Sequence, residues 1–188
     1  MIDLFDGIAR FYDLLYSDKD TNKEVLYIKK LIDKYSKSTK SILELGSGTG
    51  RHGFALAKMG YEIDGIERSK SMVDAAKTCE GFSLFEGDIK NLILSKTFDC
   101  VISIFHVMSY QISNRDVEKV LNNAHRHLKK EGIFIFDFWY GPAVLNIKPS
   151  IRVKTLSDEK FDITRIANPT SNSNANRVNV KYDFIVED

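Results

Sequence analysis

The sequence predicts an α/β fold: a Rossmann-like parallel sheet with helices on both faces, plus a small antiparallel sheet at the C-terminal end. First, strand and helix patterns alternate through about the first 140 residues, which is typical of a parallel sheet. Second, three alternate glycines follow the first predicted strand. Third, the pattern after Gly141-Pro142 changes to alternating polar and apolar residues, as in half-buried antiparallel strands.

Five short apolar segments are the predicted strands of the parallel sheet. The fourth is apolar nearly throughout, as expected of a strand buried on both faces. Right-handed crossovers would place the C-terminal ends of all five strands on one edge, where such sheets bind ligands. The predicted strands are residues 41–45, 61–66, 82–86, 98–105 and 133–139.

Helical spacing and end signals predict four helices, one before the first strand and three between strands. Thr21 with Glu24 has the spacing of a capping box, Ser69 and Ser113 suit N-cap positions, and Gly132 would end the last helix. The predicted helices are residues 21–36, 51–59, 69–79 and 113–131.

The segment after the fifth strand is too short to form an independent core. Residues 178–186 alternate strictly, and residues 168–176 are predicted to be a polar loop. We therefore expect a core of residues 1–142 with an N-terminal lid, and a β extension of residues 143–188 that packs on it. The predicted strands of the extension are residues 151–156, 160–166 and 178–186.

Charge and composition favour a cytoplasmic protein with a small-molecule partner. The 27 basic and 26 acidic residues give a net charge of +1, so no general attraction to nucleic acid or to anionic membranes is expected. No apolar run approaches the roughly 20 residues that cross a bilayer. The N-terminus carries acids where a signal peptide carries bases. Cys79 and Cys100 lie in apolar stretches and are predicted to be free thiols.

The segment Glu44-Leu45-Gly46-Ser47-Gly48-Thr49-Gly50 is the central feature. Its glycines let the backbone turn sharply after the strand and let a ligand approach closely. Gly48, Gly50 and Gly53 also satisfy the dinucleotide fingerprint, and Glu67 stands where a ribose-binding acid is expected. Two cofactors, a dinucleotide and S-adenosylmethionine, therefore compete for this loop.

Three acids favour S-adenosylmethionine. Glu44 would repel a pyrophosphate but would attract an ammonium and a sulfonium. Glu67, at the end of the second strand, can accept both ribose hydroxyls. Asp88, after the third strand, can accept the adenine amino group, and Ile89 and Met72 can enclose the adenine ring.

These motifs resemble those of the class I, Rossmann-like S-adenosylmethionine-dependent methyltransferases, over roughly residues 5–140. In that family the positions of residues 44–50, Glu67 and Asp88 bind the methionine moiety, the ribose and the adenine. The resemblance implies S-adenosylmethionine as cofactor and S-adenosylhomocysteine as product. The expected cofactor-binding residues are Tyr12, Glu44, Gly46, Ser47, Gly48, Gly50, Glu67, Arg68, Met72, Asp88, Ile89 and Phe105.

A narrower resemblance is to bacterial methyltransferases that act on amino groups of nucleotide-linked sugars. Residues 12–20 are similar to their N-terminal segment, whose tyrosines fold over the cofactor. Residues 105–110 and 136–142 look like their acceptor-side loops, and that group also carries an antiparallel sheet after the fifth strand. The resemblance implies an amine or hydroxyl of a small molecule or saccharide as acceptor, with N- and O-methylation both open.

His106 and Tyr12 are the candidate catalytic residues. His106 follows the fourth strand at the reactive edge, and its imidazole titrates near neutral pH, so it would act as a general base or as a hydrogen-bonding wall residue. His52 is expected on a helix surface, and His125 and His127 near a helix C-terminus are expected to interact with its dipole. No cluster has metal-ligand spacing, so no metal is predicted.

The sequence departs from the class I pattern at its end. Such chains usually continue with a helix and an antiparallel hairpin, so the fifth strand is expected to be an uncovered edge. Two alternatives stay open: an NAD-type dinucleotide-dependent oxidoreductase, and a non-catalytic cofactor-binding fragment. The apolar face of the extension would also support a homodimer.

Overall fold

A computed structural model describes residues 4–159 and 161–187. The chain forms two compact units. The first contains the described residues up to Asp13 together with Asp18–Phe138, and the second contains Leu14–Ser17 together with the described residues from Trp139 onward. Each unit has its own sheet.

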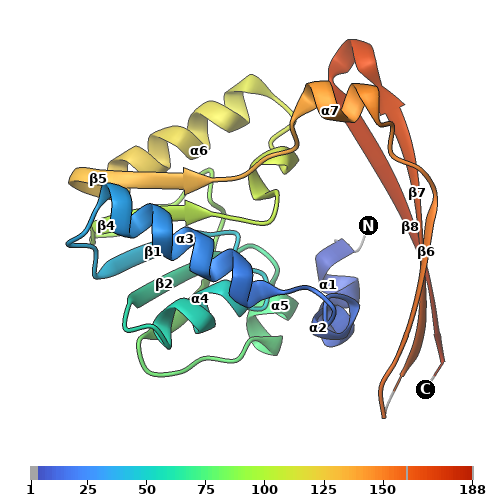
Figure 1. Cartoon of the computed structure of the whole chain (residues 1–188), viewed down its shortest axis with the longest axis horizontal. Helices are drawn as coiled ribbons and strands as arrows, with labels where there is room; N and C mark the ends of the chain where they lie inside the picture. The colour runs from blue at the N-terminus through green and yellow to red at the C-terminus, as the bar shows by residue number, and fades with distance from the viewer. Residues whose placement is uncertain (1–3, 160, 188) are drawn as a thin grey trace. The chain divides into compact units, whose positions relative to one another are not determined.

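The first unit is built on a five-stranded parallel sheet of order β3-β2-β1-β4-β5, which confirms the predicted fold class (Figure 1). β1 lies in the middle, so its C-terminal end is flanked by the ends of β2 and β4. The glycine loop that follows β1 therefore lies between the loops after β2 and β4. The strands are β1 (Ser41–Leu45), β2 (Glu62–Glu67), β3 (Phe82–Glu86), β4 (Phe98–Ser103) and β5 (Leu128–Phe136).

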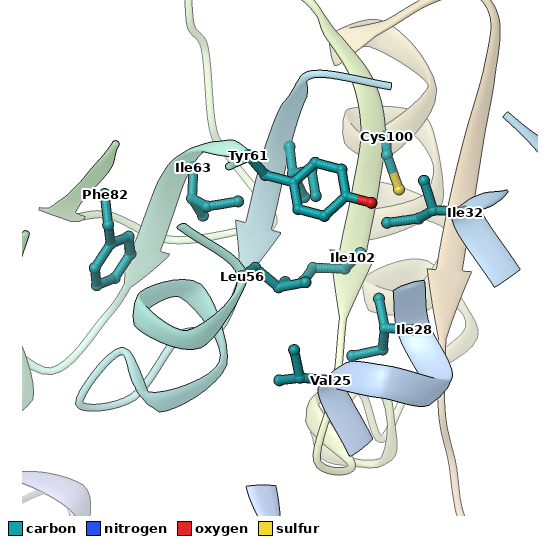
Figure 2. Close-up of a cluster of buried hydrophobic side chains, with 10 residues drawn as sticks. Val25, Ile28, Ile32, Leu56, Tyr61, Ile63, Phe82, Cys100 and Ile102 are labelled. Carbon is teal, nitrogen blue, oxygen red and sulfur yellow. The ribbon is translucent and has the colours of Figure 1, made fainter. Parts of the chain in front are cut away.

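Helices cover both faces of this sheet because its strands are apolar on both sides. Ile42 of β1 belongs to the core cluster that contains residues of α3 and α4 (Figure 2), whereas its neighbour Leu43 belongs to the cluster that contains Val120 of α6. Full burial of each such aliphatic side chain stabilises the fold by about 1.5–3 kcal/mol. The helices are α1 (Leu4–Ile8), η1 (Ala9–Phe11), α2 (Tyr12–Leu15), α3 (Thr21–Tyr35), α4 (Arg51–Ala57), α5 (Lys70–Ala75), η2 (Val107–Tyr110) and α6 (Asn114–His127).

The helix starts are set by side-chain caps. Ser69 and Ser113 cap α5 and α6 as predicted, by accepting the N–H groups of the third residue beyond them. The predicted capping box at α3 is wrong, because Asp20 accepts the N–H of Lys23 and is the cap. Glu24, the other member of the predicted box, contacts Lys19 and His52 instead.

The junction between α6 and β5 also differs from the prediction. The helix ends at His127 and the strand begins at Leu128, so Gly132 lies inside β5 and does not end the helix. The Lys129 ammonium lies 2.8 Å from the Asp99 carboxylate on β4. Glu131 takes a left-handed backbone conformation with φ of 65°.

The second unit contains a three-stranded antiparallel sheet of order β6-β7-β8. The prediction of a polar loop over residues 168–176 is wrong for its first part, since Asn168–Asn172 pairs with Arg177–Lys181. Asn176 allows the tight return by adopting φ of 50°. The elements are α7 (Gly141–Asn146), β6 (Arg152–Ser157), β7 (Asp162–Asn172), η3 (Ser173–Ala175) and β8 (Arg177–Glu187).

Leu14–Ser17, far from this sheet in sequence, belongs to the same unit. The Lys154 ammonium donates a 2.8 Å hydrogen bond to the Leu15 carbonyl. The Arg165 guanidinium lies 5.9 Å from the ring centre of Tyr16, and burial raises the pKa of that tyrosine. The sheet thus holds part of the segment that was expected to form the lid.

Two further expectations concern cysteines and membranes. Cys79 and Cys100 are free thiols as predicted, and burial raises the pKa of Cys100 to about 12. In the described part of the chain, no helix combines the length and the apolar character that spanning a membrane requires.

Candidate functional site

The glycine loop adopts a conformation that requires glycine at alternate positions. Gly46, Gly48 and Gly50 have φ values of 76°, 56° and 80°, in the left-handed region that other residues rarely enter. The N–H groups of Gly46 and Ser47 both donate to the Ile66 carbonyl at the end of β2. The loop is therefore fixed against the neighbouring strand, and ligand binding meets a preformed turn.

Glu67 links the end of β2 to the glycine loop and to α5. One carboxylate oxygen accepts the Gly48 N–H at 2.9 Å, and the other accepts the Ser69 N–H at 2.9 Å. Each carboxylate oxygen has a second lone pair, so Glu67 still has acceptor capacity for two ribose hydroxyls. The residue fits the predicted ribose role and also orders the loop around it.

The residues expected around adenine follow β2 and β3. Asp88 accepts the Lys90 N–H at 2.9 Å through one oxygen and contacts the Asn91 amide at 3.4 Å through the other. Ile89 and Met72 are buried, and Met72 is fully so. Arg68 is exposed just after β2. The structure thus places a carboxylate with free acceptor capacity beside apolar side chains.

Glu44 lies in a buried polar chain and not at the surface of the loop. Its Oε1 is 4.0 Å from Nδ1 of His52, and Nε2 of His52 is 2.8 Å from Glu24. The expectation that His52 is a surface residue is wrong, because the packing of α4 on the sheet buries it. The His52 hydrogen bond lowers the pKa of Glu24 to about 2, whereas burial raises the pKa of Glu44. Oε2 of Glu44 is buried and lacks a hydrogen-bond partner among the described residues.

The start of α2 lies on the glycine loop. Thr49 donates a 2.6 Å hydrogen bond to the Asp13 carboxylate. The ring of the adjacent Tyr12 is 3.9 Å from the position that a Cβ on Gly48 would occupy. Tyr12 therefore lies beside the glycine loop, and the Thr49–Asp13 hydrogen bond fixes the segment that carries it.

Replacing Thr49 with Val should weaken the binding of S-adenosylhomocysteine by about 0.5–1.5 kcal/mol, the net contribution of one hydrogen bond. Valine keeps the shape of threonine but cannot donate the hydrogen bond to Asp13. Part of the binding free energy must then be used to order the Tyr12 segment, so the affinity falls. Calorimetry measures the affinity for S-adenosylhomocysteine. Thr39→Val is the matched control, because Thr39 donates to the Ser36 carbonyl before β1. Equal affinities of the two variants would show that the Asp13 contact does not support binding.

The loop after β4 contains two consecutive strained residues. Phe105 and His106 have φ values of 67° and 66°, conformations that cost non-glycine residues about 1–3 kcal/mol each. The Lys19 ammonium lies 3.4 Å from the centre of the Phe105 ring. Val107 packs so closely on Gly46 that an added Cβ there would come within 2.6 Å of it. This loop and the glycine loop thus form one surface.

Asp137, the first residue after β5, holds this strained turn. Its Oδ1 accepts the His106 N–H at 2.7 Å and its Oδ2 accepts the Phe105 N–H at 3.1 Å. Sequence reasoning placed Asp137 in an acceptor-side loop without giving it a role. The sequence signal was weak, because the predicted fifth strand, residues 133–139, contained Asp137, and only the structure ends β5 at Phe136.

His127, in the last turn of α6, is fully buried. Its Nε2 accepts the Leu94 N–H at 2.9 Å, so Nδ1 carries the proton and donates to the Asn123 carbonyl at 2.8 Å. His127 is therefore a hydrogen-bonded core histidine, and His106 is the histidine at the C-terminal edge of the sheet.

A cleft of about 360 Å³ opens beside the glycine loop. It reaches Gly50 of the expected cofactor set but neither Glu67 nor Asp88. The lining residues are Asp13, Lys19, Asp20, Thr21, Asn22, Thr49, Gly50, Arg51, Phe54, Ala55 and Lys77.

Residues 42–132 match the family described as methyltransferase domain. An uncharacterised methyltransferase of Bacillus cytotoxicus is 32% identical over 155 residues, which are 77% of this chain and 73% of that protein. A dTDP-3-amino-3,6-dideoxy-alpha-D-glucopyranose N,N-dimethyltransferase of Streptomyces fradiae is 25% identical over 93% of this chain and 69% of that protein.

Solved structures show the same fold. The sugar N-methyltransferase KedS8 from Streptoalloteichus matches 99% of this chain and 78% of its own, with a TM-score of 0.79 and 18% identity. The S-adenosylmethionine-bound amino pentose methyltransferase CalS10 from Micromonospora echinaspora matches 99% of this chain and 82% of its own chain, with a TM-score of 0.73 and 17% identity.

The fold agrees with that of these solved structures. Each relative and solved structure named above is a methyltransferase and not a dinucleotide-dependent oxidoreductase. The chain belongs to the Rossmann-like S-adenosylmethionine-dependent methyltransferases.

Proposed function

We propose that this chain transfers a methyl group from S-adenosylmethionine to the amine of a nucleotide-linked amino sugar. The observation that carries the proposal is the similarity to the Streptomyces fradiae dTDP-amino-sugar N,N-dimethyltransferase, which spans 93% of this chain and so includes the antiparallel sheet as well as the Rossmann-like unit. The fold likeness to KedS8 and CalS10 likewise extends over 99% of the chain.

The residues at the edge of the sheet have separable roles in this proposal. Glu67 and Asp88 bind the ribose and the adenine, and the glycine loop accommodates the methionine moiety. When bound, the cofactor supplies an electrophilic methyl group. Because charge is lost as a sulfonium becomes a thioether, the protein acts mainly by positioning the amine and excluding water.

The acceptor amine must be deprotonated before it attacks, and in this proposal His106 accepts its proton. Its side chain is about two-fifths exposed at the end of β4. The turn that carries it contacts the glycine loop through Val107. Tyr12, which precedes the glycine loop in sequence, is the second candidate for accepting the proton.

The purified chain should methylate dTDP-3-amino-3,6-dideoxyglucose with deuterium-labelled S-adenosylmethionine. Mass spectrometry of the sugar nucleotide, with fragmentation, would place the label on nitrogen. The matched control is dTDP-glucose, which offers hydroxyls but no amine. Label on the hydroxyls of both compounds would contradict N-methylation. Label on neither, with S-adenosylhomocysteine bound normally, would contradict the substrate class.

A further inference from the structure

We propose that Asp137 is a positioning residue for methyl transfer, which holds the strained Phe105–His106 turn in the conformation that faces the reacting groups. The inference rests on the proposed function for its kinetic consequence. Its structural basis, a carboxylate bound to two consecutive left-handed residues, is independent of the acceptor. Asp137 acts through the backbone of this turn and need not touch the substrate itself.

The pairing of β4 with β5 brings these residues together. The last register pair is Ser103 with Phe136, and the Asp137 N–H continues the ladder by donating to the Ser103 carbonyl at 3.3 Å. Asp137 is thus fixed at the height at which β4 ends and the turn begins. Its side chain then reaches the next two backbone N–H groups of the turn, with one oxygen for each.

The turn needs such a partner. Left-handed conformations are unfavourable for residues with a Cβ and persist only where the surroundings enforce them. Successive N–H groups that converge on one point form a binding place for an anion. The Asp137 carboxylate occupies it, and hydrogen bonds to an ionised acceptor are stronger than those between neutral groups.

Asp99 also accepts two consecutive backbone N–H groups, but from residues whose backbone is not strained. It lies near the start of β4, and one of its oxygens accepts the N–H groups of Lys40 and Ser41 at 3.0 and 2.9 Å. Neither of these residues has a positive φ. Asp99 therefore joins two strands at the edge of the sheet opposite the ligand-binding edge. Asp137 therefore holds a strained turn at the ligand-binding edge, whereas Asp99 only stabilises the fold.

The turn carries two side chains on a fixed backbone. His106 Nδ1 lies 4.0 Å from Asp137, and the Phe105 ring is covered by the Lys19 ammonium. Without the carboxylate, Phe105 and His106 would relax toward ordinary backbone conformations. A shift of about 1 Å at a reacting group can cost on the order of 100-fold in rate.

The kinetic test compares Asp137→Ala, Asp137→Asn and the control Asp99→Ala at a temperature at which all are folded. We expect Asp137→Ala to lower kcat by about 10–100-fold while the affinity for S-adenosylhomocysteine changes by less than about threefold. Asp137→Asn should fall between, because its single carbonyl oxygen can still accept the His106 N–H. Asp99→Ala should lower the Tm but keep the wild-type kcat. Wild-type turnover in Asp137→Ala would overturn the proposal.

A second readout needs no acceptor. In the chain bound to S-adenosylhomocysteine, hydrogen exchange of the Phe105 and His106 amides should be slow in wild type and Asp99→Ala, and fast in Asp137→Ala. Slow exchange in Asp137→Ala would also overturn the proposal. If wild type fails to methylate the amino sugar while these amides behave as expected, the substrate assignment is wrong and the positioning by Asp137 is supported.

Discussion

Replacing His106 with Ala should lower turnover by about 10²–10⁴-fold, the range measured for the loss of a general acid or base. The affinity for S-adenosylhomocysteine should stay nearly unchanged, because the ribose and the adenine are assigned to Glu67 and Asp88, whereas His106 lies against Asp137. The measurement is single-turnover methylation of the amino-sugar nucleotide, with calorimetry for binding.

Two control variants make the result specific. His106→Asn keeps a side chain that tolerates the left-handed conformation but cannot take a proton near neutral pH, so it should be as impaired as His106→Ala. His125→Ala removes an exposed histidine of α6 and should retain wild-type turnover. Full activity of His106→Asn would rule out His106 as the general base. Loss of cofactor affinity in His106→Ala would assign His106 a structural role.

Tyr12→Phe tests the other candidate base. The ring that lies beside Gly48 is kept, so cofactor affinity should be preserved. If His106 is the base, turnover of Tyr12→Phe should stay within about threefold of wild type, as expected when no transition-state interaction is removed. A loss of 10²-fold or more in Tyr12→Phe but not in His106→Ala would transfer the role to Tyr12.

Replacing Glu67 with Ala should weaken S-adenosylhomocysteine binding by about 1.5–3 kcal/mol, the scale of hydrogen bonds to a charged group. The substitution removes the predicted acceptor of the ribose hydroxyls. It also removes the carboxylate that holds the N–H groups of Gly48 and Ser69. Calorimetry on the purified chain measures the change, and NAD titrated in parallel should not bind.

Glu67→Gln and Glu62→Ala are the companions of this variant. The glutamine keeps one acceptor oxygen at the same place, so its affinity should lie between wild type and Glu67→Ala. Glu62 is the exposed first residue of the same strand, at the opposite edge of the sheet, and its removal should leave binding unchanged. An affinity of Glu67→Ala equal to that of Glu62→Ala would exclude the ribose role.

The sequence alone determined the parallel sheet and predicted the cofactor side of the site. Glu67 and Asp88 were predicted to bind the cofactor because each follows a predicted strand, and parallel strands must end at one edge. The glycine loop was found because left-handed turns need glycine at particular positions, a requirement of the local backbone. Such signals depend only on neighbours along the chain, so they can be recognised without a structure.

Only the tertiary structure decided the roles that depend on residues distant in sequence. Asp137 meets the His106 N–H across 31 positions because β4 and β5 pair in one register. His52 is a buried, hydrogen-bonded residue because α4 packs on the sheet, although the helical pattern alone suggested a surface position. The extension of β7 through Asn172 was hidden because its polar residues are held by backbone pairing with β8, and backbone hydrogen bonds do not depend on side-chain hydrophobicity.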